Sequence, residues 1–205
     1  LRLQVSDPTT AQSPVSQLVA NSRVLEETSR RPLVVGVFQN QPPEFIREMV
    51  DSCGLDLVQL HGKEGMAAAN SNVNGVPTIR VVDVETDPET GKAIDTAVED
   101  IMASITADPL VILLDTAIKG SKDGGGTGVT FDWGIAEKIQ NAGLPVIIAG
   151  GLKPENVADA VQTSRPWGID VSSGVESQPG KKDHDRVRSF VRSARKAATE
   201  ASKGF

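Results

Sequence analysis

The sequence is most constrained by short runs of apolar, largely β-branched residues that alternate with segments of helical periodicity. The runs lack strict alternation of apolar and polar residues, which predicts strands covered on both faces, as in parallel sheets. Strands that alternate with helices predict an α/β fold with right-handed crossovers. The runs are 32–38, 55–60, 76–82, 109–115, 145–150 and 167–173.

Between and after these runs lie segments with the apolar spacing of amphipathic helices. The first would end at Gly54 and place Phe45, Ile46, Met49 and Val50 on one face. Thr130 is the expected N-cap of the second helix. Lys153 takes the N-cap position of the third, although Ser, Thr, Asn or Asp would be better there. The predicted helical segments are 42–54, 130–143, 153–162 and 184–197.

Two α/β architectures fit this order: an open doubly wound sheet and a closed (β/α)8 barrel of the TIM type. A closed barrel needs two strands more than the sequence shows, and the residues before Leu33 are too few for two complete βα units. Either the sheet is open, or the barrel lacks its N-terminal strands in this chain. We expect one domain over 1–205, with a partial helical segment over 1–31 and a frayed tail over 198–205.

Composition limits the classes of function. The formal net charge of -6 argues against a nucleic-acid partner, because phosphate backbones select basic faces. No apolar run reaches the roughly 18 residues of a membrane helix, so no membrane partner is expected. The single cysteine permits no internal disulfide and favours a reducing compartment, so we expect a cytoplasmic protein. This cysteine and the two histidines stand apart in the sequence, so no metal site is expected.

Two loops rich in small residues follow the last two predicted strands. Gly150 and Gly151 follow one strand, and Ser172, Ser173 and Gly174 follow the next. In parallel α/β folds the carboxyl ends of the strands form the functional face, and in barrels the last two loops commonly hold a phosphate. Glycine lets backbone N–H groups approach an anion closely, and a helix N-terminus favours one. We therefore favour a phosphate site over the alternative of two tight turns.

Asp115 ends an apolar predicted strand, which places its carboxyl group on the same functional face. Taken alone, such an Asp fits a turn cap better than a catalytic role. The glycine-rich loop over 124–128 favours catalysis, because a long flexible loop suits a lid that orders over a substrate. This loop lacks the Gly-Lys-Ser/Thr residues that end a P-loop, and it lacks the glycine spacing of a Rossmann fold. Asp115 is thus a candidate proton donor, and Gly125, Gly126 and Gly128 are candidate substrate contacts.

Three further polar residues are candidate substrate contacts. His61 ends a predicted strand, where a ligand contact and a hydrogen-bonded structural role fit equally well. Arg80 lies within an apolar strand and must face a polar barrel mouth or pair with an acid, for which Asp170, the third candidate, is available.

Cys53 ends a helix that leads into the next strand, at the opposite end from Asp115. We expect Cys53 to be a small buried residue without a catalytic role.

Several blocks of the chain occur in an order and at a spacing that resemble the phosphoribosylanthranilate isomerase family of tryptophan biosynthesis. The resemblance covers about Leu33 to Lys196 and is highly specific where the glycine-rich blocks are taken together. The blocks are VVGVFQNQ, DLVQLHG, LLDTAIKGSKDGGGTGVTFDW, IIAGGLKPENVADAV and GIDVSSGVESQPGKKDHDRVRSFV.

The resemblance implies a (β/α)8 barrel and an Amadori rearrangement that needs no cofactor. In it, N-(5-phosphoribosyl)anthranilate becomes 1-(2-carboxyphenylamino)-1-deoxyribulose 5-phosphate. Asp115 matches the family's general acid, which protonates the furanose ring oxygen. The loops at 150–151 and 172–174 match its phosphate site, and 125–128 belong to its mobile loop. The implied partner is a small phosphosugar, and fusion to or association with other enzymes of the tryptophan pathway stays open.

The chain departs from the family near its N-terminus. The family's catalytic cysteine, its general base, lies in a Lys-x-Cys-Gly block that this chain lacks, and Cys53 does not match it. By register from Val5 and Ser6, Leu3 stands where the family has an Arg that faces the anthranilate carboxylate. The chain thus resembles the isomerase without its first two strands. We expect very weak or no isomerase activity from a chain of this extent alone.

Two other classes of function stay open. A catalytically impaired phosphate-binding scaffold would keep affinity for sugar phosphates without turnover. A different barrel isomerase or aldolase acting on phosphosugars is less favoured, because no candidate Schiff-base lysine stands at a strand end.

Overall fold

The structure is a computed structural model that describes residues 32–63, 76–87, 111–118, 130–141 and 144–202. The chain divides into two compact units. Unit 1 comprises Leu1–Val82 and Glu99–Leu113, and unit 2 comprises Asp83–Val98 and Leu114–Phe205. The predicted helical segment over 1–31 lies outside the described residues. The prediction of a single domain over the whole chain stays a prediction.

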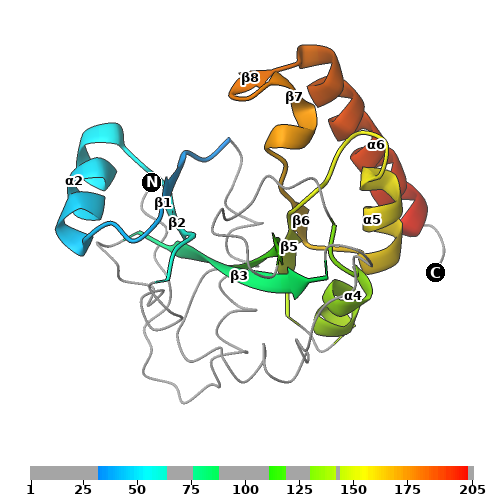
Figure 1. The fold of residues 1–205 in the computed structure, drawn as a ribbon, viewed down its shortest axis with the longest axis horizontal. Helices are drawn as coiled ribbons and strands as arrows, with labels where there is room; N and C mark the ends of the chain where they lie inside the picture. Colours follow the sequence, from blue (N-terminus) through cyan, green and yellow to red (C-terminus); the bar gives the residue numbers. More distant parts are fainter. Residues whose placement is uncertain (1–31, 64–75, 88–110, 119–129, 142–143, 203–205) are drawn as a thin grey trace. The chain divides into compact units, whose positions relative to one another are not determined.

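The strands of the main sheet all begin within the predicted apolar runs (Figure 1). Strands β3 and β4 extend beyond their runs and contribute residues to both units. The strands are β1 (Val35–Phe38), β2 (Leu57–Leu60), β3 (Thr78–Thr86), β4 (Val111–Ile118), β5 (Val146–Ile148) and β6 (Gly168–Ile169).

The order of the strands in the sheet follows the chain from β1 to β6. The pairs β1–β2, β2–β3 and β5–β6 are parallel. A doubly wound sheet reverses its order at a switch point, whereas the wall of a (β/α) barrel adds each strand beside the preceding one. The observed order therefore favours the barrel type over the doubly wound alternative. The predicted absence of two N-terminal strands stays a prediction.

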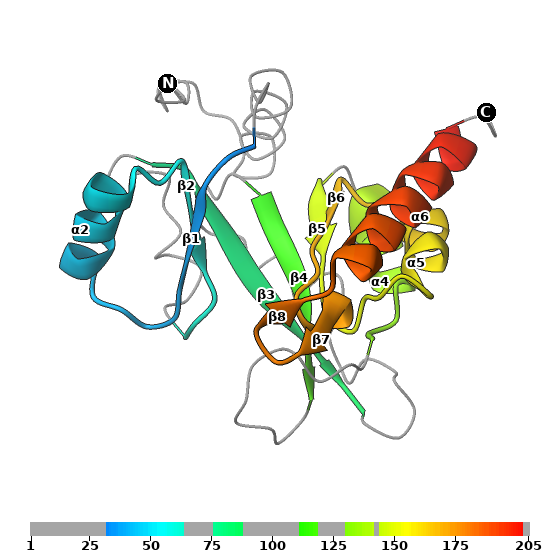
Figure 2. The ribbon, with the colours of Figure 1, turned by 90° about the horizontal axis from the view of Figure 1, so that it is seen from above.

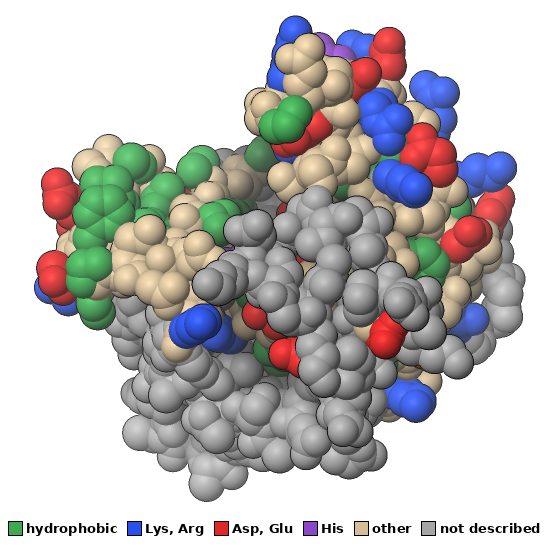
Figure 3. Space-filling model, viewed as in Figure 1, with side chains coloured by type: hydrophobic (Ala, Val, Ile, Leu, Met, Phe, Trp, Pro, Cys, Tyr) green, Lys and Arg blue, Asp and Glu red, His purple; other side chains and the backbone are tan. Residues whose placement is uncertain are grey.

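In unit 1, helix α2 (Pro43–Cys53) packs against β1 and β2 as its apolar spacing predicts. Ile46 and Val50 are buried with the strand residues, whereas Phe45 is 41% exposed. The prediction that every strand is covered on both faces is wrong for β1, where Val37 is 62% exposed. Among the described strands, β1 is an edge of the sheet, and hydrophobic side chains gather on the surface over β1 and α2 (Figure 3).

The prediction that Cys53 is buried is also wrong, because its side chain is exposed. A β-carbon built on Gly54, the residue that ends the helix, would have no atom within 4 Å. Cys53 is therefore exposed at the C-terminal end of α2 and is not packed in the core.

In unit 2, three helices lie on the same side of β5 and β6 (Figure 2). They are α4 (Gly134–Asn141), α5 (Val157–Ser164) and α6 (His184–Ser202). Between β6 and α6 the chain forms a short 3-10 helix, η2 (Ser173–Val175), and an antiparallel hairpin of β7 (Glu176–Gln178) and β8 (Lys181–Lys182). The hairpin was not predicted, since its strands carry polar residues on a solvent-exposed surface.

The two predicted N-cap residues, Thr130 and Lys153, are wrong, because both helices begin further along the chain. Helix α4 begins at Gly134, whose N–H donates to Asp132 Oδ1 at 2.9 Å, and not after Thr130. Helix α5 begins after Asn156 and not after Lys153. In both places a short polar side chain folds back on the backbone and delays the helix by a turn.

The predicted frayed tail over 198–205 is wrong for most of its length. Helix α6 continues through Ser202, and Ala197 is buried in its penultimate turn. Within this helix, the hydroxyl groups of Thr199 and Ser202 donate to carbonyl groups one turn earlier. Residues 203–205 lie outside the described part of the chain.

Candidate active site

Asp115 lies within β4, after a run of fully buried aliphatic residues that places the strand in the core of the sheet. The side chain is only 7% exposed, and its Oδ1 accepts the N–H of Thr116 at 2.7 Å. The sequence predicted that Asp115 ends the strand, which is wrong, because β4 continues to Ile118. The carboxyl group is thus held in a buried position before the end of the strand.

Gly150 lies directly against the residue that follows Asp115. Its φ is +79°, and an added β-carbon would overlap the side chain and the backbone nitrogen of Thr116. The N–H of Ala149 donates to the carbonyl of Leu114 at 2.8 Å and aligns the two segments. Only glycine suits both the positive φ and this close approach. The loop after β5 therefore lies beside Asp115.

The loop after β6 contacts the loop after β5. An added β-carbon at Gly174 would overlap the carbonyl oxygen of Leu152, so the two backbones touch. The N–H of Asp170 donates to the carbonyl of Ile148 at 2.9 Å and continues the pairing of β5 and β6 up to this contact. Unit 2 thus brings together Asp115 and both small-residue loops. Their functional roles stay predictions.

The turn after Gly151 is closed by Asn156. Its Oδ1 accepts the N–H of Lys153 at 2.8 Å, and its Nδ2 donates to the carbonyl of Gly151 at 3.1 Å. The sequence predicted a helix N-terminus directly after the glycine pair. This prediction is wrong, because α5 begins only at Val157. An anion at this loop would depend on backbone N–H groups of the loop itself.

The loop after β6 is held from the side of β8 and α6. Lys182 Nζ donates to the carbonyl of Ser172 at 2.9 Å, and Arg186 donates twice to the carbonyl of Gly174. Sequence reasoning assigned no role to Asn156, Lys182 or Arg186. All three lie in the quoted blocks IIAGGLKPENVADAV and GIDVSSGVESQPGKKDHDRVRSFV, which were the available signal.

Two carboxylates in this segment are stabilised in their ionised form. A hydrogen bond from Lys182, and then one from the N–H of Gly180, lower the pKa of Glu176 below its ordinary value of 4.5. The N–H groups of Arg186 and Asp185 likewise lower the pKa of Asp183 below 3.8. Asp183 Oδ1 accepts both N–H groups and so caps α6.

His61 and Arg80 belong to unit 1. Arg80 is buried and donates to the carbonyl groups of Leu60 and Gly62, each at 2.9 Å, so it brackets the segment that carries His61. His61 is half-buried at the end of β2, and its backbone N–H donates to the carbonyl of Phe38. The predicted pairing of Arg80 with Asp170 stays a prediction, because the two residues lie in different units.

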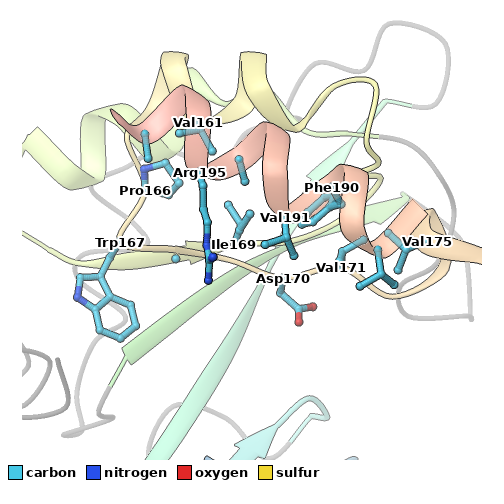
Figure 4. Close-up of a pocket in the computed structure, with 14 residues that line it drawn as sticks. Val161, Pro166, Trp167, Ile169, Asp170, Val171, Val175, Phe190, Val191 and Arg195 are labelled. Carbon is cyan, nitrogen blue, oxygen red and sulfur yellow. The ribbon is translucent and has the colours of Figure 1, made fainter. Parts of the chain in front are cut away.

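Asp170 lines a cavity of about 510 Å³ between β6 and α6 (Figure 4). The cavity walls are largely apolar and include Ile169, Val171 and Phe190, with Arg195 at the side of α6. Neither glycine loop lines this cavity. Its apolar lining offers little to a phosphate, so we do not take it as the anion site.

Some predictions concern residues outside the described ranges. Gly125, Gly126 and Gly128 are among these, so their role as substrate contacts stays a prediction. Within the described residues, no group of three His, Cys, Asp or Glu side chains could hold a metal ion. No described helix has the length and apolar character needed to cross a membrane.

The strand order defines an α/β protein of the barrel type, in which a buried acid and two touching small-residue loops lie on the later strands. The family model for N-(5'-phosphoribosyl)anthranilate (PRA) isomerase matches residues 2–193. The chain therefore belongs to this family.

Individual relatives agree with this membership. The N-(5'-phosphoribosyl)anthranilate isomerase of Myxococcus xanthus is 45% identical over 173 residues, which are 82% of this chain and 74% of the relative. The tryptophan biosynthesis protein TRP1 of Phytophthora nicotianae is 43% identical over 83% of this chain, but only 31% of that longer protein is matched.

A solved structure of a phosphoribosyl anthranilate isomerase superposes with a TM-score of 0.63 at 31% identity and covers 90% of this chain and 80% of that one. That crystal holds reduced 1-(o-carboxyphenylamino)-1-deoxyribulose 5-phosphate.

Proposed function

We propose that this protein isomerises N-(5-phosphoribosyl)anthranilate to 1-(2-carboxyphenylamino)-1-deoxyribulose 5-phosphate in tryptophan biosynthesis. The observation that carries the proposal is the family match over residues 2–193. The relative crystallised with a reduced form of this product supports a phosphosugar as the ligand. The longer relative from Phytophthora nicotianae supports a version of the family that is joined to further polypeptide.

The proposed acid is Asp115. Opening of the furanose breaks the bond between C1′ and the ring oxygen while the anthranilate nitrogen forms a C=N bond to C1′. The ring oxygen leaves with the bonding electrons and takes a proton, which Asp115 supplies. A base then takes the C2′ proton to give an enolamine, and transfer of the C2′ hydroxyl proton to C1′ gives the ketone, so the reaction is redox-neutral overall. In the family this base is the cysteine of the Lys-x-Cys-Gly block, which this sequence does not contain. Asp115 is buried and directly precedes Thr116, the residue that Gly150 contacts, which supports an acid near the glycine loop.

The proposed phosphate site is formed by the loops at Gly150–Gly151 and Ser172–Gly174. Their mutual contact through Leu152 and Gly174 supports a shared site, since one tetrahedral anion can accept N–H groups from both. Thr116, the residue that follows Asp115, lies against Gly150 of the first of these loops. An acid and an anion-binding loop on neighbouring segments suit a substrate whose reacting ring and phosphate belong to one small molecule.

Turnover of N-(5-phosphoribosyl)anthranilate by the full-length protein, meaning the whole polypeptide that its gene encodes, tests the proposal, with chromatography of substrate and product. We expect conversion to the carboxyphenylamino-deoxyribulose phosphate by the wild type and loss of conversion with Asp115→Asn. Binding of the phosphosugar without any conversion by the wild type would contradict the proposed function and would support the scaffold alternative.

A further inference from the structure

Lys182 places its ammonium group against the loop that follows β6. Its Nζ donates to the carbonyl oxygen of Ser172 at 2.9 Å, to Ser172 Oγ at 3.5 Å and to Glu176 Oε1 at 2.7 Å. An ammonium group has three N–H donors, and two of them make short hydrogen bonds to the Ser172 carbonyl and to Glu176. Lys182 therefore holds the loop directly.

Arg186 binds the same loop at its other end. Its Nε and Nη2 donate to the carbonyl oxygen of Gly174 at 3.1 and 2.9 Å, and Nη2 lies 3.4 Å from Glu155 Oε2. Glu155 belongs to the turn after β5. Arg186 on α6 thus connects the two loops near the contact between Gly174 and Leu152. Hydrogen bonds from a charged donor are stronger than neutral ones and set the direction of the acceptor.

We propose that Lys182 and Arg186 are positioning residues for the anion-binding loop, a role that rests on the proposed function. The C=O of one residue and the N–H of the next point in opposite directions across a planar trans peptide. Lys182, by fixing the carbonyl of Ser172, fixes the N–H of Ser173 on the opposite side. Arg186, by fixing the carbonyl of Gly174, holds that peptide against Leu152.

The charges around Lys182 keep this arrangement intact at neutral pH. The hydrogen bond from Lys182 and the N–H of Gly180 hold the pKa of Glu176 below its ordinary value, so the carboxylate stays ionised opposite the ammonium. The side chain of Lys182 is 45% exposed, and exposed ion pairs contribute little to stability. The loss of Lys182 should therefore appear in anion binding more than in the stability of the fold.

Steady-state kinetics of the full-length protein, with calorimetry of inorganic phosphate, test Lys182. We expect Lys182→Met to raise both KM and the Kd of phosphate about tenfold, with kcat within about threefold of the wild type. Lys181→Met is the matched control, because Lys181 is the exposed neighbour on β8 with the same charge. Lys182→Arg should recover most of the lost affinity, since its guanidinium can donate to the same carbonyl.

Arg186→Gln should weaken phosphate binding in the same way, with Arg192→Gln on the exposed part of α6 as its control. Equal KM and Kd in Lys182→Met and Lys181→Met, or an Lys182→Met variant that does not fold by circular dichroism, would overturn the role of Lys182. A wild type that binds phosphate but does not turn over the substrate would contradict the proposed function instead. The phosphate constants of the variants would still decide the positioning role.

Discussion

Gly174 packs so closely on Leu152 that an added β-carbon would overlap the Leu152 carbonyl oxygen. This contact joins the loop after β6 to the loop after β5, and Gly150 joins the latter to Thr116 beside Asp115. Three segments that are distant in the sequence are thereby held at fixed spacing within unit 2. Rigid spacing of this kind is what a small substrate with an acid-sensitive ring and a phosphate requires.

Replacement of Gly174 by Ala should displace one loop from the other, because the neighbouring Leu152 carbonyl belongs to the backbone and cannot rotate away. We expect a loss of about 1–3 kcal/mol in the free energy of unfolding from the forced fit. The Kd of phosphate should rise as well. Denaturant unfolding and calorimetry measure the two effects. Gly134→Ala, at the start of α4, is the control and should be nearly neutral; equal behaviour of the two variants would contradict the close contact.

Asp115→Asn should lower kcat by at least about 100-fold, because an amide cannot supply the proton for ring opening. The Asn oxygen can still accept the N–H of Thr116, so the fold and product binding should be largely retained. Turnover and product titration check the two parts. Asp159→Asn, an exposed change on α5, should leave both constants unchanged. Lost product binding with retained turnover per bound substrate would count against Asp115 as the acid.

Cys53→Ser should leave turnover within about twofold and the free energy of unfolding within about 0.5 kcal/mol, because the side chain is exposed at the end of α2. Kinetics and thermal unfolding of the full-length protein measure this. A large loss of kcat without loss of fold would show that Cys53 takes part in the reaction.

The stability of unit 2 should depend on acid pH through Asp183. Its folded pKa lies below the ordinary value of 3.8, so as pH falls the unfolded chain takes up the proton first. The stabilisation is present above this range and is lost as pH falls through 3.8 to the lower folded value. Thermal unfolding from pH 6 to pH 2 should therefore fall less steeply for Asp183→Asn, which keeps a neutral cap, than for the wild type. Parallel curves would contradict the assigned cap.

Much of the fold follows from the sequence because each strand of the main sheet begins within a short, largely aliphatic run. Val111 to Leu114 are almost completely buried, and burial of this kind leaves few alternatives for the segment. The small residues at 150–151 and 172–174 pointed to loops that the structure brings together. Glycine often marks a place where another backbone segment approaches closely, and Gly174 does so against Leu152.

The remaining features depend on tertiary contacts that local pattern does not encode. Asn156 closes a turn with its side chain and so delays α5 beyond the predicted start at Lys153. Lys182 looks like an ordinary surface lysine until the hairpin brings it to Ser172. The exposure of Val37 results from the position of β1 at the edge of the described sheet, which no single strand reveals.

The central claim is that Asp115 and the two glycine loops form one site for a phosphorylated amino sugar. A crystal structure of the full-length protein with reduced 1-(o-carboxyphenylamino)-1-deoxyribulose 5-phosphate, the compound held by the related structure, tests it most directly. We predict a phosphate that accepts backbone N–H groups from both loops, with the ribulose chain at the Asp115 carboxyl group. A phosphate bound away from both loops, or a sugar that does not reach Asp115, would contradict the account.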